Sequence, residues 1–184
     1  MKFFKKIFAP EKFISRAKIC LLFILLVGMK PAADEGNEYS VKAMFIYNFT
    51  KYIDWPQSTN NKTFRIGIIG KSEIFETLQL VASQKKVDNR QIEIKKITED
   101  DNSYYQLIFI AKSETQNINE LSKKYFGKGV LIVSEECKRS ERGATINLLT
   151  TDNKVRFEIS QGCARNAGLK VSSILINLAV AVNP

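Results

Sequence analysis

The chain has 184 residues, of which 28 are basic and 19 acidic, and its formal net charge is +9. It contains no histidine, which excludes Ser-His-Asp and Cys-His catalysis and every His-ligated metal site. The charge is uneven, because residues 1–33 hold seven basic residues and one acid while the remainder holds 21 basic and 18 acidic residues. The main part is therefore only mildly basic, and nucleic acid is not an expected partner.

The first 33 residues have the order of a secretory signal. Basic residues within 2–18 precede an apolar run at 19–27, and small residues follow. Nine to eleven apolar residues span about 14–17 Å as a helix, well short of a ~30 Å hydrocarbon core. We therefore expect residues 1–33 to be a signal peptide, residues 34–184 to be one exported periplasmic domain, and no stable membrane span after the leader is removed. An uncleaved anchor or a buried helix is the alternative, because Lys30 and Pro31 make a poor cleavage site.

Two of the three cysteines, Cys137 and Cys163, lie outside the leader. In an oxidising compartment an even pair favours one disulfide, which stabilises the fold by roughly 3–4 kcal/mol in the chain-entropy model. Two unbonded thiols are the alternative. Two cysteines without histidine cannot close a structural zinc site, and we expect neither a metal nor another cofactor.

In chain order, residues 34–38 are polar and expected to be irregular. Residues 40–55 carry apolar side chains at three- and four-residue spacing, which predicts a helix. Ser40 is its expected N-cap, and Pro56 is expected to stop it. Asn48 lies on the apolar stripe and is expected to be a hydrogen-bonded structural residue.

The middle of the chain alternates short strands and helices. Helix 115–126 is expected to turn Leu121, Tyr125 and Phe126 inward. The full predicted order is strand 64–69, helix 72–82, strand 91–97, strand 107–111, helix 115–126 and strand 130–133. This order is typical of a largely parallel sheet with helices on its faces.

The last part of the chain predicts a hairpin and a broken helix. Strands 144–149 and 155–159 are joined by a four-residue turn, 150–153. Residues 161–182 predict two helical pieces with a break near Gly168. The last apolar stripe is expected to consist of Ile174, Leu175, Leu178, Ala179 and Val182. The expected fold is a single-domain α/β protein with a largely parallel sheet, flanking helices and a C-terminal antiparallel hairpin.

Gly70-Lys71-Ser72 is a candidate anion site, because it follows a predicted strand and opens a helix. A phosphate-binding loop needs a glycine five residues before Gly70, where Arg65 stands, so nucleotide hydrolysis is not expected. Only a weak anion site remains.

A second candidate surface lies in the C-terminal segment, where apolar and capping residues cluster. We expect a partner protein to bind there, at Leu169, Val171, Ser172, Ser173 and Ile174. The alternative is that the two serines only cap the last helix.

These segments resemble the YfiR-like family of periplasmic proteins. The resemblance starts at residues 39–49, continues through Trp55-Pro56 and is best at 155–159 and 164–173. It covers residues 39–180, nearly all of the chain after the leader. The family-motif residues to which it assigns a structural role are Asn48, Trp55, Pro56, Arg156, Glu158 and Gly168.

The resemblance implies a periplasmic α/β domain that is often dimeric, so a homodimer is one expected assembly. The best-understood members restrain a membrane-bound diguanylate cyclase by binding its periplasmic sensor domain, and release raises cyclic-di-GMP and biofilm formation. Related domains are fused to sensor kinases. We therefore expect a regulatory binding protein and not an enzyme, with an inner-membrane diguanylate cyclase or sensor kinase as partner. A periplasmic module that senses a small molecule or anion near Gly70 to Ser72 is the alternative.

Overall fold

The structure, a computed structural model, describes residues 35–56, 62–138 and 143–184. The predicted leader lies outside these ranges.

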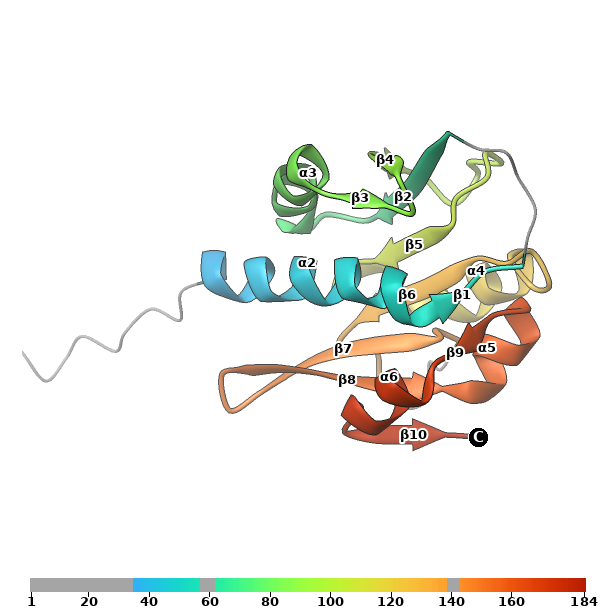
Figure 1. Cartoon of the computed structure of the whole chain (residues 1–184). Helices are drawn as coiled ribbons and strands as arrows, with labels where there is room; N and C mark the ends of the chain where they lie inside the picture. Colours follow the sequence, from blue (N-terminus) through green and yellow to red (C-terminus); the bar gives the residue numbers. More distant parts are fainter. Residues whose placement is uncertain (1–34, 57–61, 139–142) are drawn as a thin grey trace, which may run out of the picture. The chain divides into compact units, whose positions relative to one another are not determined.

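One sheet organises the described part of the chain (Figure 1). Its strands are β2 Thr63–Ile69, β3 Lys86–Val87, β4 Arg90–Ile97, β5 Leu107–Ile110, β6 Leu131–Glu135, β7 Ile146–Thr151, β8 Lys154–Ser160 and β10 Ala181–Asn183. They lie in the order β10-β8-β7-β6-β5-β2-β4-β3. From β4 to β7 all neighbours are parallel, whereas β7 and β8 form an antiparallel hairpin. The predicted fold class is confirmed.

The helices cover both faces of this sheet. They are α2 Glu35–Tyr52, α3 Ile74–Gln84, the 3-10 helix η1 Lys112–Asn117, α4 Ile118–Lys124, α5 Gln161–Ala167 and α6 Ser173–Leu178. Along β5, Leu107 and Phe109 pack into the core under α2 and α3, while Ile108 and Ile110 pack into a second core under α4. Burial on both faces explains why this strand is continuously apolar in sequence.

Helix α2 differs from its predicted bounds at both ends. It begins at Glu35, so residues 35–38 are not irregular and Ser40 lies inside the helix instead of capping it. Its first turns are held from outside, because Thr150 on β7 donates a 2.8 Å hydrogen bond to Glu38. The helix ends at Tyr52, before Pro56, because the next two residues leave it to form strand β1, Ile53–Asp54.

Strand β1 pairs with β9, Lys170–Val171, in a separate antiparallel pair. Neither strand was predicted from the sequence, since two residues are too few to show an alternating pattern. Strand β3 was not predicted either; it joins β4 through Asp88 and Asn89, with φ of 48° and 64°. Two positive φ angles are typical of a tight two-residue hairpin turn.

The predicted break near Gly168 is confirmed, since Gly168 ends α5 with φ 77°. The predicted last apolar stripe does not lie on one helix, and Leu175 is buried whereas Ile174, Leu178 and Val182 are exposed. The reason is that α6 ends at Leu178 and the chain then extends into β10. Phe126 is likewise exposed and not inward, because α4 ends at Lys124. None of the helices described here is both long enough and apolar enough to cross a membrane.

Candidate functional site

The pair of strands β1 and β9 brings two distant sequence motifs together. Ile53 lies opposite Val171, and Asp54 opposite Lys170. The backbone N–H of Ser172 adds a 2.9 Å hydrogen bond to the carbonyl of Tyr52. The segment that ends in Trp55-Pro56 is thereby fixed against the segment that begins at Gly168.

Trp55 is anchored at this junction. Its indole N–H donates to the backbone carbonyl of Gln106 at 3.1 Å, and its ring meets that of Phe64 edge-on, with centroids 5.4 Å apart. Pro56 is exposed beside it. These contacts hold Trp55 in place, and the half-buried indole also borders a cavity.

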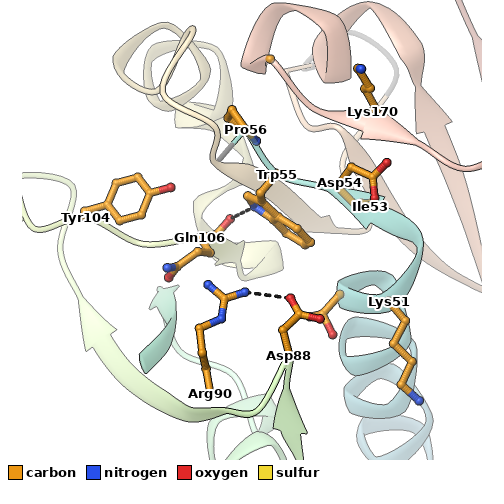
Figure 2. A pocket seen from close by; sticks show the side chains of 12 residues that line it. Lys51, Ile53, Asp54, Trp55, Pro56, Asp88, Arg90, Tyr104, Gln106 and Lys170 are labelled. Atoms are coloured by element: carbon orange, nitrogen blue, oxygen red, sulfur yellow. Dashed lines mark hydrogen bonds and ion pairs between the residues drawn. The ribbon is translucent and has the colours of Figure 1, made fainter. Parts of the chain in front are cut away.

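That cavity, which we call the Trp55 cavity, has a volume of about 780 Å³ (Figure 2). It lies at the amino ends of parallel strands β2, β4 and β5, since Arg90 opens β4 and Gln106 directly precedes β5. The remaining wall comes from the end of α2, β1, the turn before β4 and the start of β9. Ligands of doubly wound sheets usually bind at the opposite, carboxyl ends.

Three polar side chains line one side of the Trp55 cavity (Figure 2). The guanidinium of Arg90 donates to Asp88 at 3.0 Å and lies 5.2 Å from the ring centre of Phe64. The Gln106 amide oxygen accepts the backbone N–H of Arg65 at 2.8 Å. Burial raises the pKa of Tyr104 in spite of the charge of Arg90, so its hydroxyl stays protonated near neutral pH.

The carboxyl ends of the parallel strands hold the predicted anion site. Strand β2 has β4 on one side and β5 on the other, so Gly70 stands where the strand order reverses. The Ser72 hydroxyl, however, already accepts the backbone N–H of Ile74, the first residue of α3, at 3.3 Å. The hollow there is also lined by Glu73 and Glu76 beside its lysines, and carboxylates repel an anion. Anion binding at Gly70, Lys71 and Ser72 stays a prediction.

A buried ion network, which was not predicted from the sequence, lies close to the same end of the sheet. Lys42 on α2 is only 2% exposed, and its ammonium lies 2.5 Å from Glu38 and 2.6 Å from Glu135. Burial opposes the charge on Lys42, but the hydrogen bonds to the two carboxylates outweigh it and raise the pKa above its ordinary value. Two features of the sequence could have indicated this network. One is a lysine in the buried stretch of an amphipathic helix, and the other is a glutamate at the end of a buried strand.

The two cysteines outside the leader lie on different elements. Cys137 follows β6, where Asn147 bonds to both its backbone N–H and its carbonyl, at 2.9 and 3.1 Å. Cys163 lies in the first turn of α5, and its backbone N–H donates to Ser160. Both are half-buried and carry thiols in this structure. Their disulfide stays a prediction.

The predicted partner-binding segment is divided by the fold. Leu169 is buried in the core, and Val171 is half-buried in the β1–β9 pair. The hydroxyl of Ser172 accepts the backbone N–H of Leu175 at 3.3 Å and so caps α6. Only Ser173 and Ile174 are exposed.

The other motif residues are also placed by the fold. Asn48 is half-buried on α2, and its structural role stays a prediction. Arg156 and Glu158 lie on the face of β8 opposite to the buried Phe157, as the alternation predicted. Among the described residues, no three Cys, Asp or Glu side chains are grouped as a metal site requires.

Comparison with known proteins identifies the chain at the level of its family. The model of the YfiR/HmsC-like family matches residues 39–180, the region on which the sequence resemblance rested. No curated protein matches the chain. Proteins of this family are periplasmic and regulatory rather than catalytic, and the match supports a regulator of diguanylate cyclase signalling. The chain belongs to the YfiR/HmsC-like family.

Proposed function

We propose that this protein restrains an inner-membrane diguanylate cyclase, or a sensor kinase, by binding its extracytoplasmic domain. Family membership supports the signalling role. We place the binding surface on α6 and β10 because these elements present a group of exposed apolar side chains. We call it the C-terminal apolar surface; its members are Ile174, Leu178, Val180 and Val182, which are 56%, 62%, 48% and 41% exposed.

A single exposed apolar side chain is ordinary in a soluble protein, but a group is not. Here four fall within nine residues, on a short helix and the strand after it. Strand β10 is an edge of the sheet and bonds only to β8 among the described strands. Burial of such a surface under a partner removes apolar area from water and so favours binding.

Binding of this kind regulates without chemistry. If the protein binds the inactive state of the partner more tightly than the active state, it shifts the partner toward inactivity. The size of the shift equals the difference between the two binding free energies. Restraint therefore requires a complementary surface and no catalytic group.

The experiment uses the host strain with the gene deleted. We expect deletion to raise cyclic-di-GMP, and the wild-type gene to lower it again. Ile174→Asp and Leu178→Asp should fail to restore the low level, because a carboxylate buried in an apolar interface is costly. Leu80→Asp is the matched control, since Leu80 on α3 is 61% exposed and lies outside the surface.

All three variants should keep their unfolding free energy to within about 0.5 kcal/mol, because the side chains are exposed. Full restoration of low cyclic-di-GMP by Ile174→Asp and Leu178→Asp would contradict the proposal. Sedimentation of the same variants tests the expected homodimer: if two copies associate through this surface, the variants should be monomeric while Leu80→Asp still associates.

A further inference from the structure

We propose that the Trp55 cavity binds a small organic anion, with one carboxylate on a planar apolar body. The cavity is separate from the C-terminal apolar surface, and the inference does not depend on which partner that surface binds.

The size and walls of the cavity suit a small molecule. Its volume of about 780 Å³ falls within the roughly 300–1,000 Å³ that is usual for ligand sites. Its walls are held by the β1–β9 pairing and by the hydrogen bond from Trp55 to the Gln106 backbone. A ligand would therefore meet a preformed site, which lowers the entropy cost of binding.

The strongest single observation is the side chain of Gln106, which is 3% exposed and borders the cavity. Its amide oxygen is used, because it accepts the backbone N–H of Arg65. Its amide nitrogen makes no hydrogen bond to another described residue, yet it is not a buried atom without a partner, since the Tyr125 hydroxyl is the only such side-chain atom in the described part of the chain. The amide nitrogen is therefore open to the cavity, where a ligand that accepts its hydrogen bond would take the place of water.

Two further donors line the same cavity (Figure 2). The hydroxyl of Tyr104 makes no hydrogen bond to any described residue. Arg90 uses one nitrogen on Asp88, which leaves other N–H groups of the guanidinium for a ligand. In Figure 2 the Gln106 side chain is drawn between Tyr104 and Trp55, with the Arg90 guanidinium below it.

This inventory sets the chemical class of the ligand. All three groups can donate, so the ligand must accept, and a guanidinium matches the two oxygens of a carboxylate. The lining holds three basic and two acidic residues, an excess of one positive charge, which suits a monoanion better than a phosphate dianion. The half-buried face of the Trp55 indole would cover a flat apolar body.

Trp55 fluorescence can report ligand binding at this cavity without an added label, because Trp55 is the only tryptophan of the chain. Emission of the full chain, excited selectively at the indole, would be titrated with phenylacetate. The matched neutral probe is phenylacetamide, and inorganic phosphate tests an anion without an apolar body. We expect a saturable change with phenylacetate, about tenfold or more weaker binding of phenylacetamide, and no saturable change with phosphate.

Variants assign the binding to the named groups. Arg90→Gln should weaken phenylacetate binding about tenfold or more, and Tyr104→Phe about threefold. Arg65→Gln is the control for the arginine, because Arg65 pairs with Glu93 outside the cavity lining. Tyr125→Phe is the control for the tyrosine, since the Tyr125 hydroxyl is buried under α4 without a partner among the described residues.

Urea unfolding followed by circular dichroism would confirm that each variant is folded, and Tyr104→Phe removes only one oxygen. The proposal is overturned if phenylacetate causes no saturable change in Trp55 emission, or if phenylacetamide or phosphate binds as well. It is also overturned if the Arg65→Gln and Tyr125→Phe controls weaken binding as much as the cavity variants do.

Discussion

At the scale of single residues, Lys42 departs most from its surroundings. It is almost fully buried among apolar side chains and is compensated by Glu38 and Glu135. A buried ion pair adds little net stability over an apolar pair, but removal of one partner leaves a charge without compensation.

We therefore expect Glu135→Gln to lower the free energy of unfolding by about 3 kcal/mol, the lower end of the usual range because Glu38 still faces Lys42. Urea unfolding measures this. The control is Lys123→Gln, which breaks the exposed pair with Glu120 on α4 and should cost less than about 0.5 kcal/mol. Equal losses in the two variants would show that the network is not an energetically distinct unit.

The same network predicts the pH dependence of stability. Burial opposes the charge of Glu38, but hydrogen bonds from Lys42 and Thr150 outweigh it and hold the pKa of Glu38 below its ordinary 4.5. A lowered carboxyl pKa contributes stability above pH 4.5, and this is lost as the pH falls through the folded value. The raised pKa of Lys42 contributes stability below pH 10.5, and this is lost as the pH rises through the folded value.

Urea midpoints across the pH range should therefore fall at both extremes in the wild type. In Lys42→Met the alkaline fall should shrink, and the acid fall should shrink as well, because Glu38 loses its cation. An unchanged acid fall in Lys42→Met would refute the assignment to Glu38.

At the scale of elements, Gly168 decides how the C-terminal segment turns back toward β1. Its φ of 77° lies in the left-handed region, and a Cβ placed there meets no atom within 4 Å. The cost of a substitution is therefore one of backbone conformation and not of space. We expect Gly168→Ala to lower the unfolding free energy by about 1 kcal/mol, and Gly168→Asn by less, since asparagine tolerates this conformation. Equal losses in urea unfolding would point to another cause.

The two hairpins show that a strand must be long enough to display an apolar pattern before the sequence predicts it. The hairpin of β7 and β8 was predicted because both strands are long enough to show an apolar pattern, although its turn is the tighter Asp152-Asn153, with φ of 50° and 57°. The turn Asp88-Asn89 has the same conformation, but β3 has only two residues and left no pattern.

At the scale of the whole molecule, export to the periplasm and a disulfide between the two cysteines are tested together, because an oxidising compartment favours the bond. Protein recovered from the periplasm should lack residues 1–33 and should weigh two hydrogens less than the fully reduced chain, because Cys137 and Cys163 would be bonded. Reduction should then lower the unfolding free energy by roughly 3–4 kcal/mol. Intact mass measured before and after reduction checks both points. A full-length mass in the membrane fraction would refute cleavage, and an unchanged mass on reduction would refute the disulfide.

The fold was more predictable than the sites. Strands such as β2 and β5 are compact apolar runs, so their existence and order followed from local pattern. Ile174, Leu178 and Val182 were predicted to share one apolar stripe because they are apolar at helical spacing, and the structure leaves all three exposed. Spacing indicates which residues share a face, but it does not say whether another element covers that face.

The sequence by itself indicated the longer strands and helices in chain order, the largely parallel sheet, the hairpin of β7 and β8 and the family, because each shows in residues close together in the chain. Only the tertiary structure decided that Trp55 meets Gln106, 51 residues away, and that Lys42 meets Glu135, 93 residues away. Cavities and buried ion pairs arise where separate elements end and pack against one another. The periodicity of side chains within one helix or strand does not indicate which residues of other elements they will contact.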